Sequence, residues 1–254
     1  MWTGDYVFVL ENLVMKDFKI RYRNMSLGVF WSLLNPLIMM GVLTFVFTVV
    51  FPNNTIKSFP VFVLCGLMPY NFFALAWASG TNCLVDNAGL VKRVPIPRLV
   101  LPVASVLSNC VHLLIQIVVL LSFALAFGFG VNRYWWWLPL VWLLEIIFVM
   151  GLVMLCSAID VYVRDVRYAV ESSNLVLFWL VPIFYGFEVI PQRLAGIYEY
   201  NPVAALVLAL RKILMEATPP PSTLMWKLTG SSLLVFVVGL MTFKGLERRF
   251  YEHL

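Results

Sequence analysis

The chain has few charged residues: Asp, Glu, Lys and Arg make up 12% of its 254 residues, whereas 62% are hydrophobic. Soluble domains carry about 25% charged residues, which keep their surfaces hydrated. The composition therefore excludes a soluble globular protein and predicts an integral membrane protein. We expect a single membrane domain over residues 1–254, because about six spans of roughly 20 residues each use most of the chain.

The sequence also lacks the motifs of several enzyme classes. It contains no GxxxxGK[ST] phosphate loop, no HExxH and no GxSxG. Its four cysteines form no CxxC pair and mostly lie in apolar runs, so we interpret them as small hydrophobic residues. We therefore expect no catalytic residue, no metal site and no cofactor bound by this chain. The net charge of +5 bears on orientation in a membrane, and nucleic-acid binding is not expected.

Long apolar runs are what the sequence has in abundance, and they predict an all-α fold with six transmembrane helices. The predicted spans are about 30–51, 60–79, 99–127, 137–159, 173–190 and 228–243. Polar and apolar residues alternate at helical spacing over 5–23, which predicts an amphipathic interfacial helix before the first span. The apolar stretch 203–210 is too short to span and predicts a re-entrant or interfacial helix before the last span.

The distribution of Lys and Arg predicts the orientation of these spans. With six spans, 12 of the 18 basic residues fall on the face that holds both termini. Cytoplasmic loops carry the excess of positive charge, so both termini are predicted to be cytoplasmic. The aromatic run 134–137 then lies at the outer interface, where amphipathic rings anchor a span.

Three groups of residues are candidates for a functional role. The loop 80–98 contains a short helix-forming stretch, 86–93, that Pro95 and Pro97 halt. Composition alone favours a solvated positive loop over a surface that receives a motor subunit. At the cytoplasmic end of the fourth span, alternating charges over 160–167 fit either a solvated helix end or a contact with a partner.

The third group lies inside the membrane. Four polar residues share one face of the third span, at spacings of four, three and four: Ser105, Asn109, His112 and Gln116. Glu145 lies at a comparable depth in the fourth span, and an unpaired buried carboxylate costs several kcal/mol. We therefore predict that Glu145 bonds to His112 or Gln116. A polar clasp between helices is favoured over a proton relay or a substrate site.

Five sequence segments occur in an order typical of one transporter family. They are KIRYRNMSLGVFWSLLNP (19–36), NAGLVKRVPIPR (87–98) with Leu101-Pro102 after it, YVRDV (162–166), Asn201-Pro202 with Arg211 beyond, and LERRFY (246–251). With the predicted topology, they make the chain resemble the membrane subunit of ABC-2 type exporters. The resemblance is to those that move lipid-linked polysaccharides such as O-antigen, capsule or teichoic acid.

The resemblance implies a complex of two such membrane subunits, a homodimer, with two ABC ATPase subunits that bind ATP and Mg. In this family the loop after the second span is a coupling helix that docks on the ATPase. The coupling residues implied here are Asp86, Asn87, Leu90, Lys92, Arg93, Arg98, Arg164 and Asp165. The implied polysaccharide pathway contains the aromatic residues Tyr22, Phe30, Trp31, Phe178, Trp179, Phe184 and Tyr185. The location implied is the bacterial inner (plasma) membrane, in contact with its lipids.

Three other functions remain open from the sequence. An ABC-2 drug or lipid exporter shares the same topology. An integral membrane glycosyl- or acyltransferase would use Glu145, His112 or Asp160 as acid or base. A passive channel would transport without nucleotide.

Overall fold

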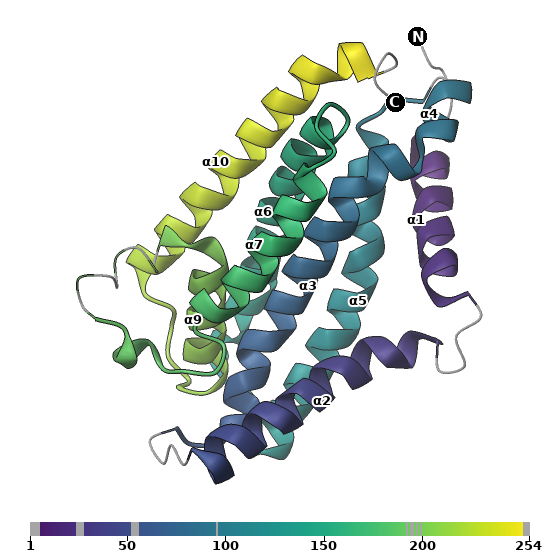
Figure 1. The fold of residues 1–254 in the computed structure, drawn as a ribbon. Helices are drawn as coiled ribbons and strands as arrows, with labels where there is room; N and C mark the ends of the chain where they lie inside the picture. The colour runs from purple at the N-terminus through teal and green to yellow at the C-terminus, as the bar shows by residue number, and fades with distance from the viewer. Residues whose placement is uncertain are drawn as a thin grey trace.

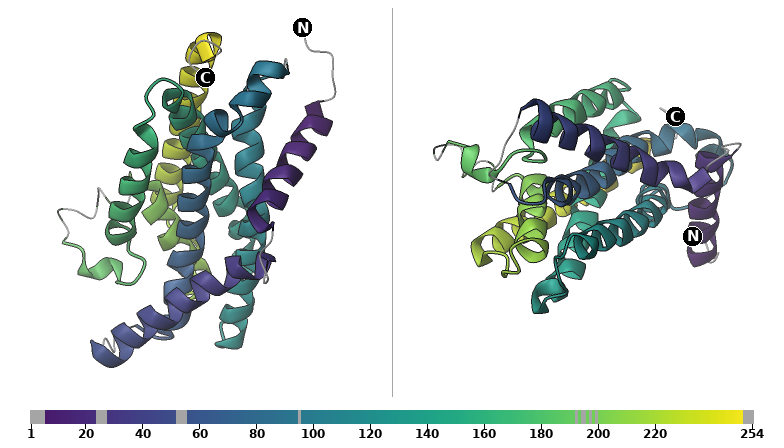
Figure 2. Two further views of the ribbon diagram at one scale, coloured as in Figure 1. Left: turned by 45° about the vertical axis from the view of Figure 1, so that its right-hand side comes forward. Right: turned by 90° about the horizontal axis from the view of Figure 1, so that it is seen from below.

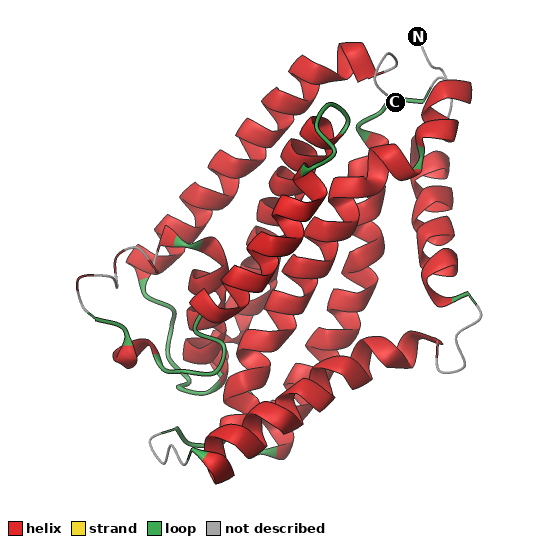
Figure 3. Ribbon diagram, viewed as in Figure 1, coloured by secondary structure: helices red, strands yellow, loops and turns green. Residues whose placement is uncertain are grey.

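The computed structural model describes residues 6–23, 28–51, 56–94, 96–191, 193, 196, 198 and 200–250. These residues form helices and connecting loops, with no strand among them (Figure 3). The longer helices are α1 (Tyr6–Tyr22), α2 (Trp31–Phe45), α3 (Phe59–Asp86), α4 (Ala88–Arg93), α5 (Val100–Ala126), α6 (Leu138–Asp160), α7 (Val166–Leu180), α9 (Pro202–Leu214) and α10 (Ser222–Leu246). Short or π-helical turns are η1 (Gly28–Phe30), η2 (Val46–Val50), η3 (Arg133–Trp137), η4 (Phe187–Val189) and η5 (Glu247–Arg249). The predicted all-α fold is confirmed.

The long helices α3, α5, α6 and α10 form a bundle, and α7 packs on α3 (Figure 1). Helix α1 runs alongside α5, while α2 crosses obliquely at the end of the bundle opposite α4 (Figure 2). The start of α1 and the end of α10 lie at the same end as α4 (Figure 1). The first and the last long helices therefore have their outer ends on one side of the bundle, and the cytoplasmic location of the termini stays a prediction.

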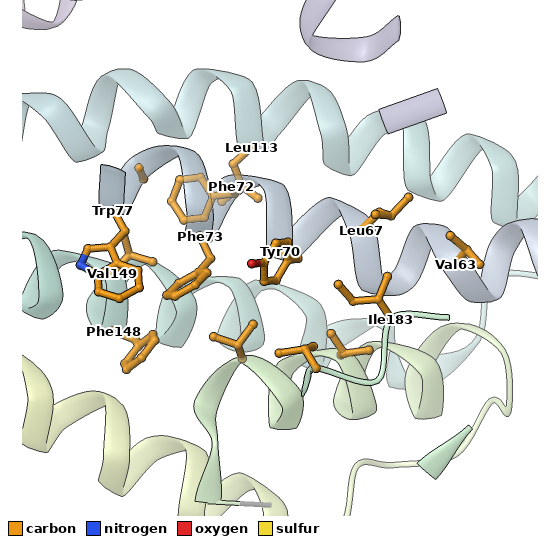
Figure 4. Packing of buried hydrophobic residues seen from close by; sticks show 14 of the residues in the cluster. Val63, Leu67, Tyr70, Phe72, Phe73, Trp77, Leu113, Phe148, Val149 and Ile183 are labelled. Carbon is orange, nitrogen blue, oxygen red and sulfur yellow. The ribbon is translucent and has the colours of Figure 1, made fainter. Parts of the chain in front are cut away.

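Helix α3 is the centre of the bundle because it is apolar nearly all round. Its adjacent residues Phe72 and Phe73 are both buried and point to different neighbours (Figure 4). Phe72 points toward Leu113 of α5, and Phe73 stacks on Phe148 of α6 with ring centroids 6.0 Å apart. A helix that is hydrophobic on all sides is a buried one, so the other helices assemble around α3.

Five helical segments of the described residues are long and apolar enough to cross a membrane. They are Trp31–Val50, Phe59–Arg93, Val100–Ala126, Arg133–Asp160 and Ser222–Arg249. These correspond to the first four predicted spans and the last. Helices α5 and α6 match the predicted limits to within a residue, whereas α3 and α10 are longer than predicted.

The predicted fifth span, 173–190, is wrong as a continuous helix. Helix α7 ends at Leu180, and Val181 is extended, with φ −70° and ψ 135°. The cause is Pro182, since a proline has no N–H and excludes its preceding residue from the helical region. The 15 residues of α7 rise about 22 Å, which is less than the roughly 30 Å of a hydrocarbon core. Six crossings therefore stay a prediction.

The two predicted non-spanning helices are both present. Helix α1 covers most of 5–23, Asp5 lying outside the described residues, and it buries Leu13 against α3 and α5. Val7, predicted on its apolar face, is exposed. Helix α9 is longer than the predicted 203–210, and the Asn201 side chain begins it by accepting from the Val203 N–H at 3.1 Å. Their positions relative to a membrane surface stay predictions.

Candidate functional site

Helix α4 forms a short, charged projection at one end of the bundle (Figure 1). Helix α3 continues to Asp86, so the predicted loop start at residue 80 is wrong; Thr81 and Leu84 are buried and keep this stretch helical. Asn87 separates the two helices, and its carbonyl accepts from the Leu90 and Val91 N–H groups at 2.9 and 3.0 Å. The predicted short helix is thus present.

The apolar residues Leu90 and Val91 anchor α4 in the bundle and leave its charges exposed to another molecule. Val91 is buried in the same cluster as Leu13 of α1 and Leu101 of α5. Lys92 and Arg93 are exposed, as is Asp86 at the end of α3. Residue 95, predicted to halt the helix, lies outside the described residues; Val94 is already extended. An exposed charged surface on a fixed apolar anchor suits docking better than a flexible loop does.

Helix α4 is also connected to the N-terminal helix. The Lys16 ammonium of α1 donates a hydrogen bond to the Asn87 side-chain oxygen. The Asn87 amide in turn donates to the Cys83 carbonyl at 2.8 Å. No local sequence pattern predicts the Lys16 contact, because the two residues are 71 positions apart.

The end of α10 closes over the same region. Arg98 donates to the Glu247 carbonyl and lies 5.9 Å from the centre of the Phe250 ring. The Tyr162 hydroxyl donates to the Leu246 carbonyl at 2.8 Å. Arg98, like Asn87, is therefore engaged within the chain, since its guanidinium holds the Glu247 carbonyl just after α10.

The loop between α6 and α7 lies at this end as well. Arg164 and Asp165 are exposed, as a docking role requires. Asp160 is fully buried, and its carboxylate lies 4.0 Å from the Arg167 Nε. The charged stretch 160–167 thus divides into an ion pair within the chain, between buried Asp160 and partly exposed Arg167, and two exposed charges at the tip of the loop.

The polar face of α5 contacts α3 and α1, and not the predicted Glu145 of α6. Asn109 donates to the Ser79 hydroxyl of α3 at 3.0 Å. The Tyr22 hydroxyl of α1 lies 2.7 Å from His112 Nδ1, and Phe18 stacks on the same imidazole. Helix α1 is therefore held to α5 by a polar and aromatic contact between half-buried Tyr22 and buried His112.

The predicted bond from Glu145 to His112 or Gln116 is wrong. Both carboxyl oxygens of Glu145 are buried without a hydrogen-bond partner among the described residues, and so is the side-chain oxygen of Gln116. His112 bonds to Tyr22 instead. Helical spacing identified the polar face of α5 but not the rotation of α6 that would bring Glu145 to it.

Four of the seven predicted pathway aromatics lie together, where α7 ends. The centroids of Trp179 and Phe184 are 5.3 Å apart, as are those of Phe184 and Tyr185, and Phe178 lies 6.0 Å from Phe184. Trp179 is 61% exposed, whereas Phe184 is buried and serves the core. The Tyr185 hydroxyl donates to the Leu180 carbonyl at 2.7 Å, which fixes the turn after α7.

The other three aromatics are separate from this cluster. Tyr22 is used in the His112 contact, and Phe30 and Trp31 are exposed at the start of α2. The π-helical turn η2, which continues α2, does reach the cluster through Phe47, whose ring lies 5.4 Å from Phe184. Phe47 was not predicted, because one Phe in an apolar run has no distinguishing pattern.

Comparison with known proteins identifies the family. A family model described as ABC-2 type transporter matches residues 9–215. The chain belongs to this family.

Its relatives match it over nearly the whole length. The O-antigen export system permease protein RfbA of Klebsiella pneumoniae is 31% identical over 249 residues, which cover 98% of this chain and 94% of that protein. RfbA of Myxococcus xanthus is 28% identical over 250 residues, covering 98% and 96%. The polysialic acid transport protein KpsM of Escherichia coli is 22% identical over 243 residues, covering 94% and 93%. The relatives are transport permeases, and the resemblance drawn from the five segments is confirmed.

Within this ABC-2 type permease, sequence reasoning missed the environment of Arg211. Arg211 is 5% exposed, and it lies on the Phe62 ring with its guanidinium carbon 3.4 Å from the centroid. It donates to the Ile183 carbonyl at 2.7 Å, and at longer range to those of Phe62 and Tyr185. Burial lowers the pKa of Arg211 to about 9, so the side chain is still charged at neutral pH. The sequence marked Arg211 only as part of the Asn201-Pro202 segment, with no sign of its burial or of its partners.

Proposed function

We propose that this chain is the membrane subunit of an ATP-driven exporter of a lipid-linked polysaccharide, of the O-antigen, capsule or teichoic acid class. It moves the polymer from the cytoplasmic to the outer side of the bacterial inner or plasma membrane and does not alter it chemically. The observation that carries the proposal is the nearly full-length similarity to O-antigen export permeases.

The energy comes from a partner in this proposal. The sequence has no phosphate loop of its own, so ATP and Mg bind to a separate ABC ATPase. Two copies of the chain associate with two ATPase subunits. The exposed charges of Asp86, Lys92 and Arg93 on and beside α4 supply a docking surface, and the exposed tip at Arg164 and Asp165 extends it. Closure of the ATPase dimer on ATP then pushes α4 and biases the bundle between two states.

An apolar face that the described residues leave exposed supports the homodimer. On α2 and η2, exposed apolar residues recur at spacings of four, three and four: Ile38, Val42, Phe45 and Val49. Either lipid or the second subunit covers such a stripe. We place the second subunit there, because α2 then lines the pathway between the copies together with the aromatic cluster at the end of α7. Exposed rings such as Trp179 would stack on the C–H faces of the sugars.

The location and orientation follow from the charges. The α4 end of the bundle carries exposed Lys92, Arg93, Arg164, Lys244, Arg248 and Arg249. Positive charge is retained on the cytoplasmic side, so we assign this end and both termini to the cytoplasm.

An enzyme is less well supported by the site. His112 is engaged by Tyr22, and Glu145 has no partner among the described side chains that would make it half of a dyad. Asp160 lies 15 residues after Glu145 on the same helix, or about 22 Å along its axis. The three candidate acid and base groups therefore do not converge on one reaction centre.

The first experiment is to purify the tagged chain in mild detergent from its native membranes and to identify the proteins that come with it. We expect an ATPase subunit with a phosphate loop in equal amount, and hydrolysis that changes when membrane-extracted lipid-linked glycans are added. Small amphiphiles that alter hydrolysis while glycans do not would favour a drug or lipid exporter. A chain that is purified alone, with no effect of ATP on transport, would refute the proposal.

A charge reversal tests the docking surface itself. Lys92→Glu should reduce polysaccharide export at least about tenfold, because like charges facing one another across an interface cost several kcal/mol. Lys244→Glu is the matched control, since Lys244 is also exposed near the α4 end but lies on α10. Both variants should insert normally, as judged by the amount of chain in the membrane. Equal export by the two variants would contradict the assignment of α4.

A further inference from the structure

A cavity of about 700 Å³ lies at the end of the bundle opposite α4. Several segments distant in sequence form its walls: the residues before α3, the loop after α5, the turn after α7, α9, and the start of α10. Figure 1 shows α9 and the start of α10 at this end. Its volume falls within the roughly 300–1,000 Å³ that is usual for ligand pockets.

Arg211 is the residue in this cavity that most needs an additional partner. Arg211 lines the cavity, yet it is 5% exposed. No carboxylate of the described residues forms an ion pair with it, and its Nε has no hydrogen-bond partner. The three carbonyls around it offer only partial negative charge. A buried cation without a counter-ion is costly, which an anionic ligand in the cavity would offset.

The remaining walls are suited to an anion that carries a hydrocarbon chain. Lys57 and Lys212 add two positive charges, and Glu188 and Glu216 add two negative ones. Lys212 is paired with Glu216, so the cavity retains one excess positive charge, that of Arg211. Between the charged groups the walls are apolar, among them Ile56, Phe129, Leu208 and Met215.

We propose that this cavity binds a phosphate-bearing amphiphile, a phosphate ester on a hydrocarbon chain, with Arg211 contacting the phosphate. A guanidinium is suited to phosphate oxygens in geometry and charge. The apolar walls accommodate the start of the chain and disfavour a free hydrated ion. The amphiphile is either an anionic membrane lipid or a phosphorylated carrier lipid, since the two share this chemistry. The site goes beyond the export proposal. Its binding of a phosphate-bearing amphiphile does not depend on which substrate the chain transports.

The test is a calorimetric titration of the full chain in a maltoside detergent, without any ATPase. The probes are dioctanoyl phosphatidic acid and farnesyl phosphate, with dioctanoylglycerol, farnesol and inorganic phosphate as matched controls. We expect at least one phosphorylated amphiphile to bind about tenfold more tightly than its neutral counterpart and than inorganic phosphate. Preference for the acyl or the isoprenoid chain then distinguishes a membrane lipid from a carrier lipid. Equal binding of phosphorylated and neutral probes would overturn the proposal.

Two variants locate the binding. Arg211→Gln removes the charge and should weaken binding of the preferred probe at least about tenfold. Arg133→Gln is the control, because Arg133 is an exposed arginine on η3, next to the loop after α5, that does not line the cavity. Arg211 also donates to three carbonyls, so its substitution could disturb folding. Leu208→Trp is therefore a second variant, because it fills the cavity and keeps the charge of Arg211. Wild-type affinity in Leu208→Trp, or in a folded Arg211→Gln, would place the ligand elsewhere and refute the site.

Because the titration uses the chain alone, its outcome is separate from that of the export proposal. An exporter whose cavity binds no lipid phosphate would pass the export test and fail the titration. A protein that binds lipid phosphate and exports nothing would give the opposite result.

Discussion

The contact between α6 and α10 provides the sharpest test of the packing. Gly151 of α6 and Gly239 of α10 face each other where the two helices meet. A Cβ added at Gly239 would lie 2.1 Å from the Gly151 carbonyl oxygen. Helices in membranes approach closely through such small residues, because lipid supplies no hydrophobic force to drive them together. We therefore expect Gly239→Ala to destabilise the protein.

The size of the effect follows from this distance. Ordinary van der Waals contact begins at 3.4 Å, so the added methyl is 1.3 Å too close, and its neighbour is a backbone atom that cannot rotate away. The helices must separate by about that distance. Overpacking of this kind costs about 1–3 kcal/mol, and a backbone clash belongs at the upper end of that range. Against this, Ala gains about 0.5–1 kcal/mol over Gly inside a helix. The net loss expected is about 2 kcal/mol.

The assay is unfolding of the purified protein in detergent, followed by the fluorescence of its tryptophans. Gly230→Ala is the matched control: it lies on the same helix, and an added Cβ there meets nothing within 4 Å. That variant should be unchanged or slightly more stable. If Gly239→Ala and Gly230→Ala had the same stability, the close approach of α6 and α10 would be refuted.

Two smaller predictions concern the contacts of α1 and of the C-terminal end. Tyr22→Phe removes the hydrogen bond to His112 and should cost about 1 kcal/mol, seen as faster amide hydrogen exchange in α1; unchanged exchange there would contradict the docking of α1 on α5. Arg98→Gln removes a charge-assisted bond to the Glu247 carbonyl and should cost about 1.5 kcal/mol, seen as faster exchange at the end of α10. The matched control is Arg93→Gln, because Arg93 is exposed, and it should leave the exchange at the end of α10 unchanged. A similar effect of the two variants would show that the loss of a positive charge is responsible, and not the loss of the bond to Glu247.

Much of the fold was predictable, because membrane helices are apolar over a length fixed by the bilayer. The limits of α5 and α6 are predicted to within a residue, since charged residues or a Trp-rich turn bound them in the sequence. The end of α7 was mispredicted although its cause is visible: Pro182 interrupts an apolar run that hydropathy treats as continuous. Hydropathy records composition, whereas a proline acts through backbone geometry.

The candidate sites also have a part that the sequence predicts and a part that it does not. The helix at α4 was predictable, because its start and stop signals are local in sequence. The environments of Arg98, Glu145 and Arg211 were not predictable from the sequence. Arg98 bonds to a carbonyl 149 positions away, and Arg211 bonds to Ile183, 28 positions away. Such contacts depend on the rotation and register of whole helices, which apolar periodicity does not fix when every face of a helix is apolar.

The contacts around α4 indicate which parts of the bundle would respond to an ATPase. The Lys16 side chain connects α1 to Asn87, the residue before α4. Arg98, a few residues after α4, bonds to the Glu247 carbonyl at the end of α10. Helix α1 in turn is held to α5 through Tyr22 and His112. Val91 fixes α4 in the core, so α4 cannot move without displacing these neighbours. A push on α4 therefore reaches α1 and α10 directly. Helix α7 and its aromatic cluster are reached through α3 and α6, so in the export proposal their motion should follow that of the N-terminal helix.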